Sequence, residues 1–171
     1  SAGISHKSYF IGSGGVAAVI DPRRDCEVYL KIAERNNLDI KYIYETHRNE
    51  DFVIGSVELK EITDAEIYHG PHMDFKYGNT TSEGDKFQMG SMELGILETP
   101  GHTHESISIT VEDNAVSNDV YLTFTGDTIF AGETGRVDLY GKSERNKNAE
   151  DLYNSIHNKI LPLGDQVILC P

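Results

Sequence analysis

Residues 44–52 read Tyr44-Glu45-Thr46-His47-Arg48-Asn49-Glu50-Asp51-Phe52. They continue an apolar segment, Ile40 to Tyr44, that predicts a β-strand. His47 would then lie just beyond a strand end, where a rigid sheet can aim its imidazole. Two later strand-like segments repeat this arrangement, one before His102 and one before Asp127. Two imidazoles and one carboxylate that converge at strand ends leave open coordination positions, and this set suits a mononuclear non-haem iron(II) oxygenase. The sequence therefore predicts a metal site.

The composition limits the classes of protein and partner. At 171 residues, the chain is long enough for one domain with a sizeable core and too short for two ordinary domains. The formal net charge of −13 argues against nucleic acid and against an anionic membrane surface as partners. No apolar run approaches the roughly 20 residues of a membrane-spanning helix. Cys26 and Cys170 form no Cys-x-x-Cys pair, and we expect free thiols in a cytoplasmic protein.

Turn residues divide the chain into many short strands and few helices. We expect strands over residues 8–12, 16–21, 39–45, 65–68, 85–89, 92–98, 106–111, 120–125 and 166–170, and helices over residues 25–36, 53–59 and 149–160. The polar, Gly-rich residues 69–84 predict an irregular loop in which His69 and His72 are exposed. Residues 129–147 predict a long connection of the kind that is often functional. This order favours mostly antiparallel sheets with helices packed outside.

Four short motifs occur in a fixed order: Thr46-His47 with Asp51, Gly101-His102-Thr103, Gly126-Asp127-Thr128 and Gly135-Arg136-Val137-Asp138. Together they resemble the motifs of the metallo-β-lactamase superfamily, and most of all those of its glyoxalase II and persulfide dioxygenase branch. The resemblance implies an α/β (α+β) fold of the αββα sandwich type, in which two mixed sheets lie face to face with helices on the outer faces.

A further segment, Asp21-Pro22-Arg23-Arg24-Asp25, and the motif around His47 are similar to members fused to a C-terminal rhodanese domain. Residues 1–171 are therefore expected to be one metallo-β-lactamase-like domain, excised from a longer protein and lacking both the last segment of the fold and any rhodanese domain.

The first motif departs from the family pattern. The family has His-x-His-x-Asp-His, whereas this chain has His47-Arg48-Asn49-Glu50-Asp51-Phe52. In binuclear members the Asp and the final His of that motif hold the second metal. Phe52 has no donor atom, and Asn49 is a weak, neutral donor that is poor at holding zinc. The resemblance therefore implies one iron(II) ion per chain, held by His47, His102 and Asp127, with zinc as the alternative.

The resemblance implies an enzyme of sulfur metabolism that oxidises a thiol persulfide with dioxygen and gives a thiol and sulfite. Two further residues are candidate catalytic residues. Asp51 could orient a metal ligand or a water molecule, or it could simply be an acid at a helix N-terminus. Arg136 could hold a substrate carboxylate or a persulfide anion, or it could form a local ion pair with Asp138 that shapes the loop.

Two other functions stay open at this point. One is a mononuclear zinc hydrolase that acts on a thioester, as glyoxalase II does. The other is a non-catalytic module that docks a sulfurtransferase partner such as a rhodanese domain. The sequence carries no recognisable signature for the thiol carrier, and it leaves the oligomeric state open, a homodimer included.

Overall fold

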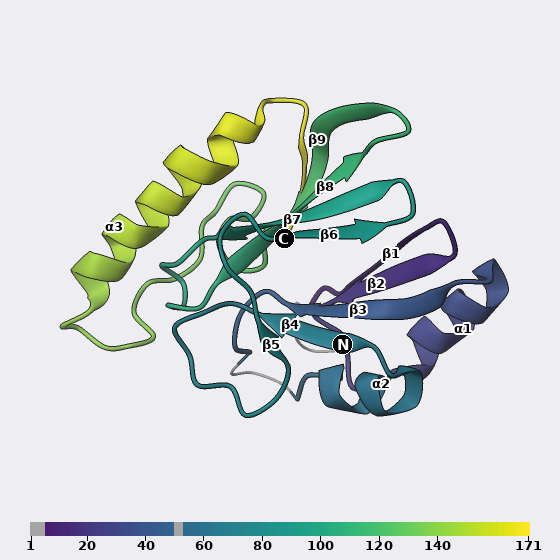
Figure 1. Cartoon of the computed structure of the whole chain (residues 1–171). Helices are drawn as coiled ribbons and strands as arrows, with labels where there is room; N and C mark the ends of the chain where they lie inside the picture. The colour runs from purple at the N-terminus through teal and green to yellow at the C-terminus, as the bar shows by residue number, and fades with distance from the viewer. Residues whose placement is uncertain (1–5, 50–52) are drawn as a thin grey trace.

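The computed structural model describes residues 6–49 and 53–171. Within these ranges the strands form two five-stranded sheets, and the helices lie outside them (Figure 1). The elements in chain order are β1 (Tyr9–Ser13), β2 (Val16–Ile20), α1 (Glu27–Asn36), β3 (Asp39–Glu45), α2 (Ser56–Thr63), β4 (Glu66–His69), β5 (Asn79–Thr80), β6 (Lys86–Met89), β7 (Met92–Glu98), β8 (Ile107–Asp113), β9 (Ser117–Phe124), α3 (Arg145–Ser155) and β10 (Ile168–Cys170). No helix in the described ranges is long and apolar enough to span a bilayer.

The first sheet has the strand order β1-β2-β3-β4-β5. β1 and β2 form an antiparallel hairpin, but the pairs from β2 to β5 are all parallel. Helix α1 connects β2 to β3 and helix α2 connects β3 to β4, so the chain returns each time to the same end of the sheet. The expectation of mostly antiparallel sheets is therefore wrong for this sheet, because the two helices are crossover connections.

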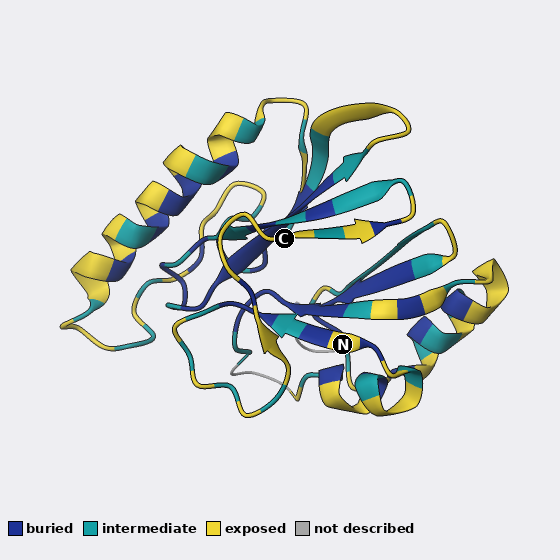
Figure 2. Cartoon of the chain, viewed as in Figure 1, coloured by how far each residue is buried: buried dark blue, intermediate teal, exposed yellow. Residues whose placement is uncertain are grey.

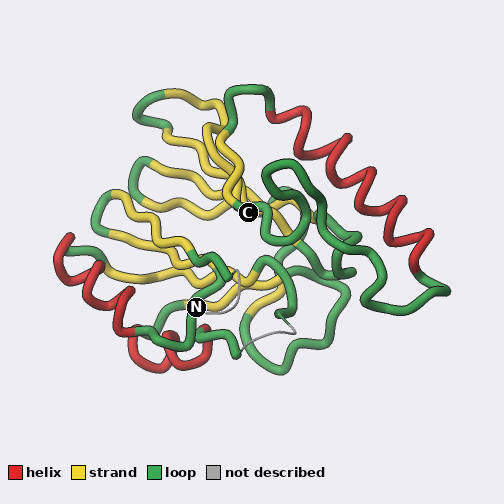
Figure 3. The backbone as a smooth tube through the Cα atoms, turned by 180° about the vertical axis from the view of Figure 1, so that it is seen from behind, coloured by secondary structure: helices red, strands yellow, loops and turns green. Residues whose placement is uncertain are grey.

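The second sheet has the strand order β10-β9-β8-β7-β6 and is antiparallel except for the parallel pair of β9 and β10. Both sheets are thus mixed, and the predicted fold class is confirmed. The loops gather at one end of the two sheets, beside α3, as the view from behind shows (Figure 3).

Successive side chains of β2 point to opposite faces of the first sheet, and each face packs into a separate hydrophobic layer. Ala17 and Val19 pack toward α1, whereas Ala18 and Ile20 face the second sheet. All four side chains are fully buried, so β2 lies in the middle of the domain (Figure 2). Because both faces of the first sheet are covered at β2, this strand reads as a continuous apolar run.

Three local predictions need correction. Helix α2 spans Ser56–Thr63, so it begins three residues and ends four residues later than the expected helix over residues 53–59. Helix α3 begins at Arg145, four residues before the expected start, and continues beyond Ser155 as a π-helical turn, Ile156–Ile160. The segment expected to be an irregular loop contains β5, and His69, at the end of β4, is buried rather than exposed. The His69 ring stacks on Phe75 at 4.0 Å, and its Nε2 lies 2.9 Å from the carbonyl oxygen of Tyr77. These contacts inside the loop cover the ring.

Candidate metal centre

Three side chains from both sheets meet at the end where the loops gather. His47 follows β3, His102 lies in the turn between β7 and β8, and Asp127 follows β9. One potential ligand atom of each lies within 4.8 Å of the others. Asp127 Oδ2 is 3.4 Å from His102 Nε2 and 3.9 Å from His47 Nε2. The structure thus brings together the three predicted ligands, and no other cluster of this kind occurs among residues 6–49 and 53–171.

Backbone contacts hold the loops of the two sheets together at this point. The N–H of Ile107, the first residue of β8, donates to the carbonyl oxygen of Thr46 over 2.8 Å. The Asp127 loop lies directly on Thr46, since a Cβ built on Gly126 would be 2.4 Å from Thr46 Oγ1. Gly126 also has a φ of +48°, a conformation that side chains other than that of Gly rarely adopt. Glycine at this position therefore allows the close approach of the His47 and Asp127 loops.

A buried chain of hydrogen bonds orients His47. The backbone N–H and the hydroxyl of Thr46 donate to the Asp21 carboxylate over 2.8 and 2.7 Å. A hydroxyl has one proton to donate, so Thr46 Oγ1 accepts from His47 Nδ1–H, 2.8 Å away. This pattern assigns the Nδ1–H tautomer and leaves the lone pair of Nε2 directed at the site.

His102 has the same tautomer for a different reason. Its Nδ1–H donates to the carbonyl oxygen of Arg136 over 3.0 Å, so its Nε2 is also available to a metal. The His47 and His102 rings are buried and lie edge to face, with centroids 5.0 Å apart. Burial holds the pKa of His47 well below that of a free imidazole, so the ring is neutral at pH 7. Two imidazoles and the more exposed Asp127 carboxylate are a donor set that fits either zinc or iron(II).

A buried carboxylate that the sequence analysis missed ties the ligand loops together. Glu105 is almost fully buried and follows His102 by three residues. Its Oε1 accepts from the backbone N–H of Arg48, next to His47, over 2.9 Å. Its Oε2 accepts from the Tyr140 hydroxyl, in the connection after Asp127, over 3.4 Å. A single carboxylate thus joins the loops of His47 and His102 to the connection that follows Asp127.

The other predicted residues lie around the trio. The Arg136 guanidinium donates to Asp138 over 2.6 and 3.1 Å, which is the local ion pair considered above. The Asn49 amide donates to the carbonyl oxygen of His47 over 3.3 Å. Asp51 and Phe52 lie outside the described residues. The structure leaves the roles proposed for Asp51 and Arg136 as predictions.

We expect that Thr46→Val weakens metal binding about 10- to 100-fold, the usual range for loss of a group that orients a ligand. Valine has the shape of threonine but no hydroxyl, so His47 Nδ1 loses the partner that fixes its tautomer. Competition of the protein with a chromophoric chelator for zinc would measure the change. Thr46→Ser keeps the hydroxyl and should restore the affinity; equal affinity in Thr46→Val and the wild type would contradict the assigned role.

Asp21 should make the stability of the metal-free protein depend on pH. Burial, the largest cause, raises the pKa of Asp21 from 3.8 to about 7. Between these values the native state binds a proton that the unfolded state has lost, so this contribution to stability is complete below pH 3.8 and is lost as the pH rises toward 7. Each pKa unit corresponds to about 1.4 kcal/mol. Urea unfolding in a chelator from pH 4.5 to 8 should show a shallower pH dependence for Asp21→Asn than for the wild type; parallel curves would contradict this prediction.

Comparison with known proteins identifies the family. The sequence profile of the Metallo-beta-lactamase superfamily matches residues 3–170. The chain belongs to this superfamily. Hydroxyacylglutathione hydrolase GloC of Haemophilus influenzae is 28% identical to this chain, over 90% of the chain and 77% of its own length. A metallo-beta-lactamase from Staphylococcus aureus has a TM-score of 0.85 and 33% identity, covering 95% of this chain and 50% of its own. ETHE1 from Myxococcus xanthus has a TM-score of 0.81 and 27% identity, covering 95% of this chain and 68% of its own.

The superfamily domain aligns with only part of several longer relatives. Uncharacterised proteins of Mycobacterium leprae and Mycobacterium bovis are 43% and 42% identical over 89 residues, which is 36% and 37% of their lengths. Fusion of this domain to a rhodanese domain therefore stays a prediction.

Proposed function

We propose that this domain of the metallo-beta-lactamase superfamily oxidises a thiol-bound persulfide with dioxygen at a single iron ion. One persulfide, one dioxygen and one water would give one thiol, one sulfite and two protons. The outer sulfur of the persulfide is oxidised, dioxygen is reduced, and the bond between the two sulfur atoms breaks.

The observation that supports this proposal is the convergence of three candidate ligands, together with the lack of a second such group in residues 6–49 and 53–171. His47, His102 and Asp127 converge, and no second cluster of potential ligands exists in the described part of the chain. Asn49 occupies a position where the resembling family has a His, and its amide is bonded to the backbone of His47. A hydrolase that uses two metals needs a hydroxide held between them, which a one-metal site does not provide.

The chain's own groups would prepare the site as follows. Thr46 and the Arg136 carbonyl each take up the Nδ1–H of one imidazole, so both Nε2 atoms point at the metal position. Asp127 is the one charged ligand of the three, and its carboxylate would offset part of the metal charge. Bound iron(II) would supply redox chemistry and open positions for the persulfide sulfur and dioxygen. Arg136 is the candidate for holding an anionic substrate, and Asp51 is the candidate for orienting a ligand or water.

A second function is favoured by a separate observation. GloC, whose name describes hydrolysis of an acylglutathione, aligns with 90% of this chain. The same three ligands would suit zinc with a bound water, since catalytic zinc sites commonly have three protein ligands and one open position. Zinc lowers the pKa of such a water and makes it a nucleophile for a thioester carbonyl. This alternative needs no change in the arrangement of His47, His102 and Asp127.

Metal analysis and two activity assays test these functions. The protein would be expressed in zinc-free, iron-supplemented medium, purified without oxygen, and analysed for metals by mass spectrometry. Oxygen uptake would then be recorded on addition of glutathione persulfide, and hydrolysis of an acylglutathione thioester would be followed in parallel with the zinc-loaded protein.

About one iron per chain with persulfide-dependent oxygen uptake is the result we expect. Thioester hydrolysis with zinc, and no oxygen uptake with iron, would replace the dioxygenase by the hydrolase. Absence of both activities in a protein that binds metal would favour the non-catalytic module that docks a sulfurtransferase.

A further inference from the structure

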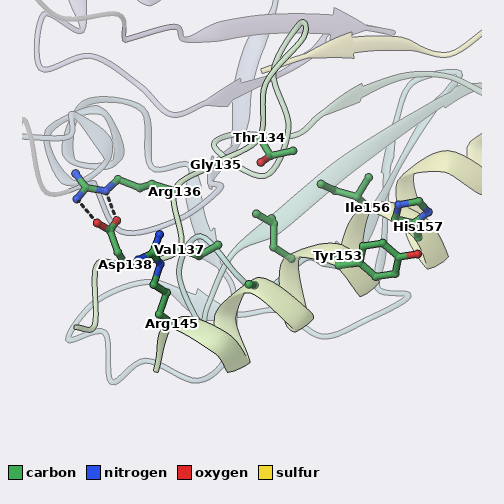
Figure 4. A pocket seen from close by; sticks show the side chains of 11 residues that line it. Thr134, Gly135, Arg136, Val137, Asp138, Arg145, Tyr153, Ile156 and His157 are labelled. Carbon is green, nitrogen blue, oxygen red and sulfur yellow. Dashed lines mark hydrogen bonds and ion pairs between the residues drawn. The ribbon is translucent and has the colours of Figure 1, made fainter. Parts of the chain in front are cut away.

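A cavity separate from the metal ligands lies between residues 134–138 and helix α3 (Figure 4). Its volume is about 620 Å³, within the usual size range of small-molecule sites. Val137 from the loop and Leu152 and Ile156 from the helical side give it an apolar lining. The ring of Tyr153, which is stacked on His157 at 4.0 Å, adds a flat surface at one end. Such a lining suits the apolar or planar body of a small molecule.

The charges at the other end of the cavity are unusual for this protein. The chain has 28 acidic and 15 basic residues, yet two arginines and one carboxylate line the cavity. Asp138 is hydrogen-bonded to Arg136, and this contact lowers the pKa of the Asp138 carboxyl. Arg145, the first residue of α3, also lines the cavity, and its charge acts on the Asp138 carboxyl. No hydrogen bond or close ion pair joins its guanidinium to a residue that the structure describes. Its guanidinium is a fork of donors that matches a carboxylate or a phosphate.

We propose that this cavity binds a small organic anion, with its carboxylate or phosphate on Arg145 and its apolar or planar body against Val137, Leu152 and Ile156. The proposal does not depend on the reaction at the metal, because none of the three candidate ligands lines the cavity. Two sources share this chemistry: the thiol carrier of a substrate, and a separate effector molecule.

The cavity is connected to the metal centre through its loop. The Arg136 carbonyl accepts from His102 Nδ1–H over 3.0 Å, and the Gly135 N–H donates to Thr128, the neighbour of Asp127, over 3.3 Å. Residues 134–138 therefore touch the cavity on one side and the segments of two metal ligands on the other. An occupant that holds this loop in place would also hold His102, so occupancy should strengthen metal binding.

Binding to metal-free protein tests the site without any need for activity. The probe is 8-anilinonaphthalene-1-sulfonate, an aromatic anion, and a series of ¹⁵N NMR spectra would locate it. We expect saturable shifts at residues 134–138 and 145–157. Arg145→Glu should weaken binding at least tenfold, whereas Arg145→Lys, which keeps the charge, should retain most of it. Arg35→Glu, at an exposed position on α1, makes the same change in net charge and should alter the affinity less than twofold.

A second variant addresses the volume of the cavity. Ala149 lines the cavity at an exposed position of α3, so Ala149→Phe should fill the space without unfolding the helix and should also weaken binding. Displacement of the probe by coenzyme A or glutathione would identify the thiol carrier as the source, and displacement by other carboxylates or phosphates alone would identify an effector. Equal binding in Arg145→Glu and the wild type, or shifts confined to other parts of the protein, would overturn the proposal.

Discussion

His102→Ala is expected to remove metal binding almost completely and with it any turnover at the site. The change deletes one of three ligands and leaves the buried His47 imidazole and the Asp127 carboxylate, which are too few donors to retain zinc or iron(II) against a chelator. The fold should persist, because the His102 side chain makes a single hydrogen bond, to the Arg136 carbonyl, in a turn outside the strands.

Metal content after dialysis against a weak chelator, combined with circular dichroism, measures this effect. His72→Ala is the matched control, since His72 is an exposed histidine of the loop between β4 and β5 and is not among the three ligands. His72→Ala should retain the metal content of the wild type. Retention of one metal per chain by His102→Ala would mean that the metal lies elsewhere, and both proposed activities would then lose their structural basis.

The positions of the candidate ligands could be predicted because each follows a recognisable strand. The apolar segments before His47, His102 and Asp127 alternate with period two and end in turn residues, and such signals depend only on neighbouring positions. The family motifs, which occur in a fixed order along the chain, also indicated that these three turns belong to one site. The sequence alone did not reveal that the first sheet is mostly parallel, because nothing local distinguishes a crossover helix from a helix that joins antiparallel strands.

The residues that support the ligands were not predictable in the same way. Asp21 was interpreted only as the last residue of a strand and as part of a family-like segment, yet its carboxylate accepts two hydrogen bonds from Thr46, 25 residues further along the chain. Glu105 is a charged residue in a turn, where exposure is the ordinary expectation, and only the folded chain shows that Arg48 and Tyr140 cover it. Periodicity predicts which face of a strand is buried; it does not predict which loops meet beyond the strand ends.

Gly135→Ala should damage the metal centre without changing any ligand. A Cβ built on Gly135 would lie 1.8 Å from the carbonyl oxygen of Asp127 and 3.1 Å from the Cβ of His102. The nearer atom belongs to the backbone, so it cannot rotate away, and the Asp127 and Gly135 segments must separate. We expect a loss of about 1–3 kcal/mol of stability, as for other overpacked sites. We also expect a fall of at least tenfold in metal affinity, because the ligands of both loops would move.

Gly132→Ala separates this steric effect from the general cost of replacing a glycine in the same connection. A Cβ on Gly132 would meet nothing within 4 Å, although its φ of +90° makes alanine unfavourable there. Gly132→Ala should therefore lower the melting temperature but leave the affinity for zinc unchanged, whereas Gly135→Ala should lower both. If both variants lost affinity equally, flexibility of the connection would control the site. If neither lost affinity, the contact between Gly135 and the Asp127 backbone would have no part in holding the ligands, and His47, His102 and Asp127 would be positioned by their own strands alone.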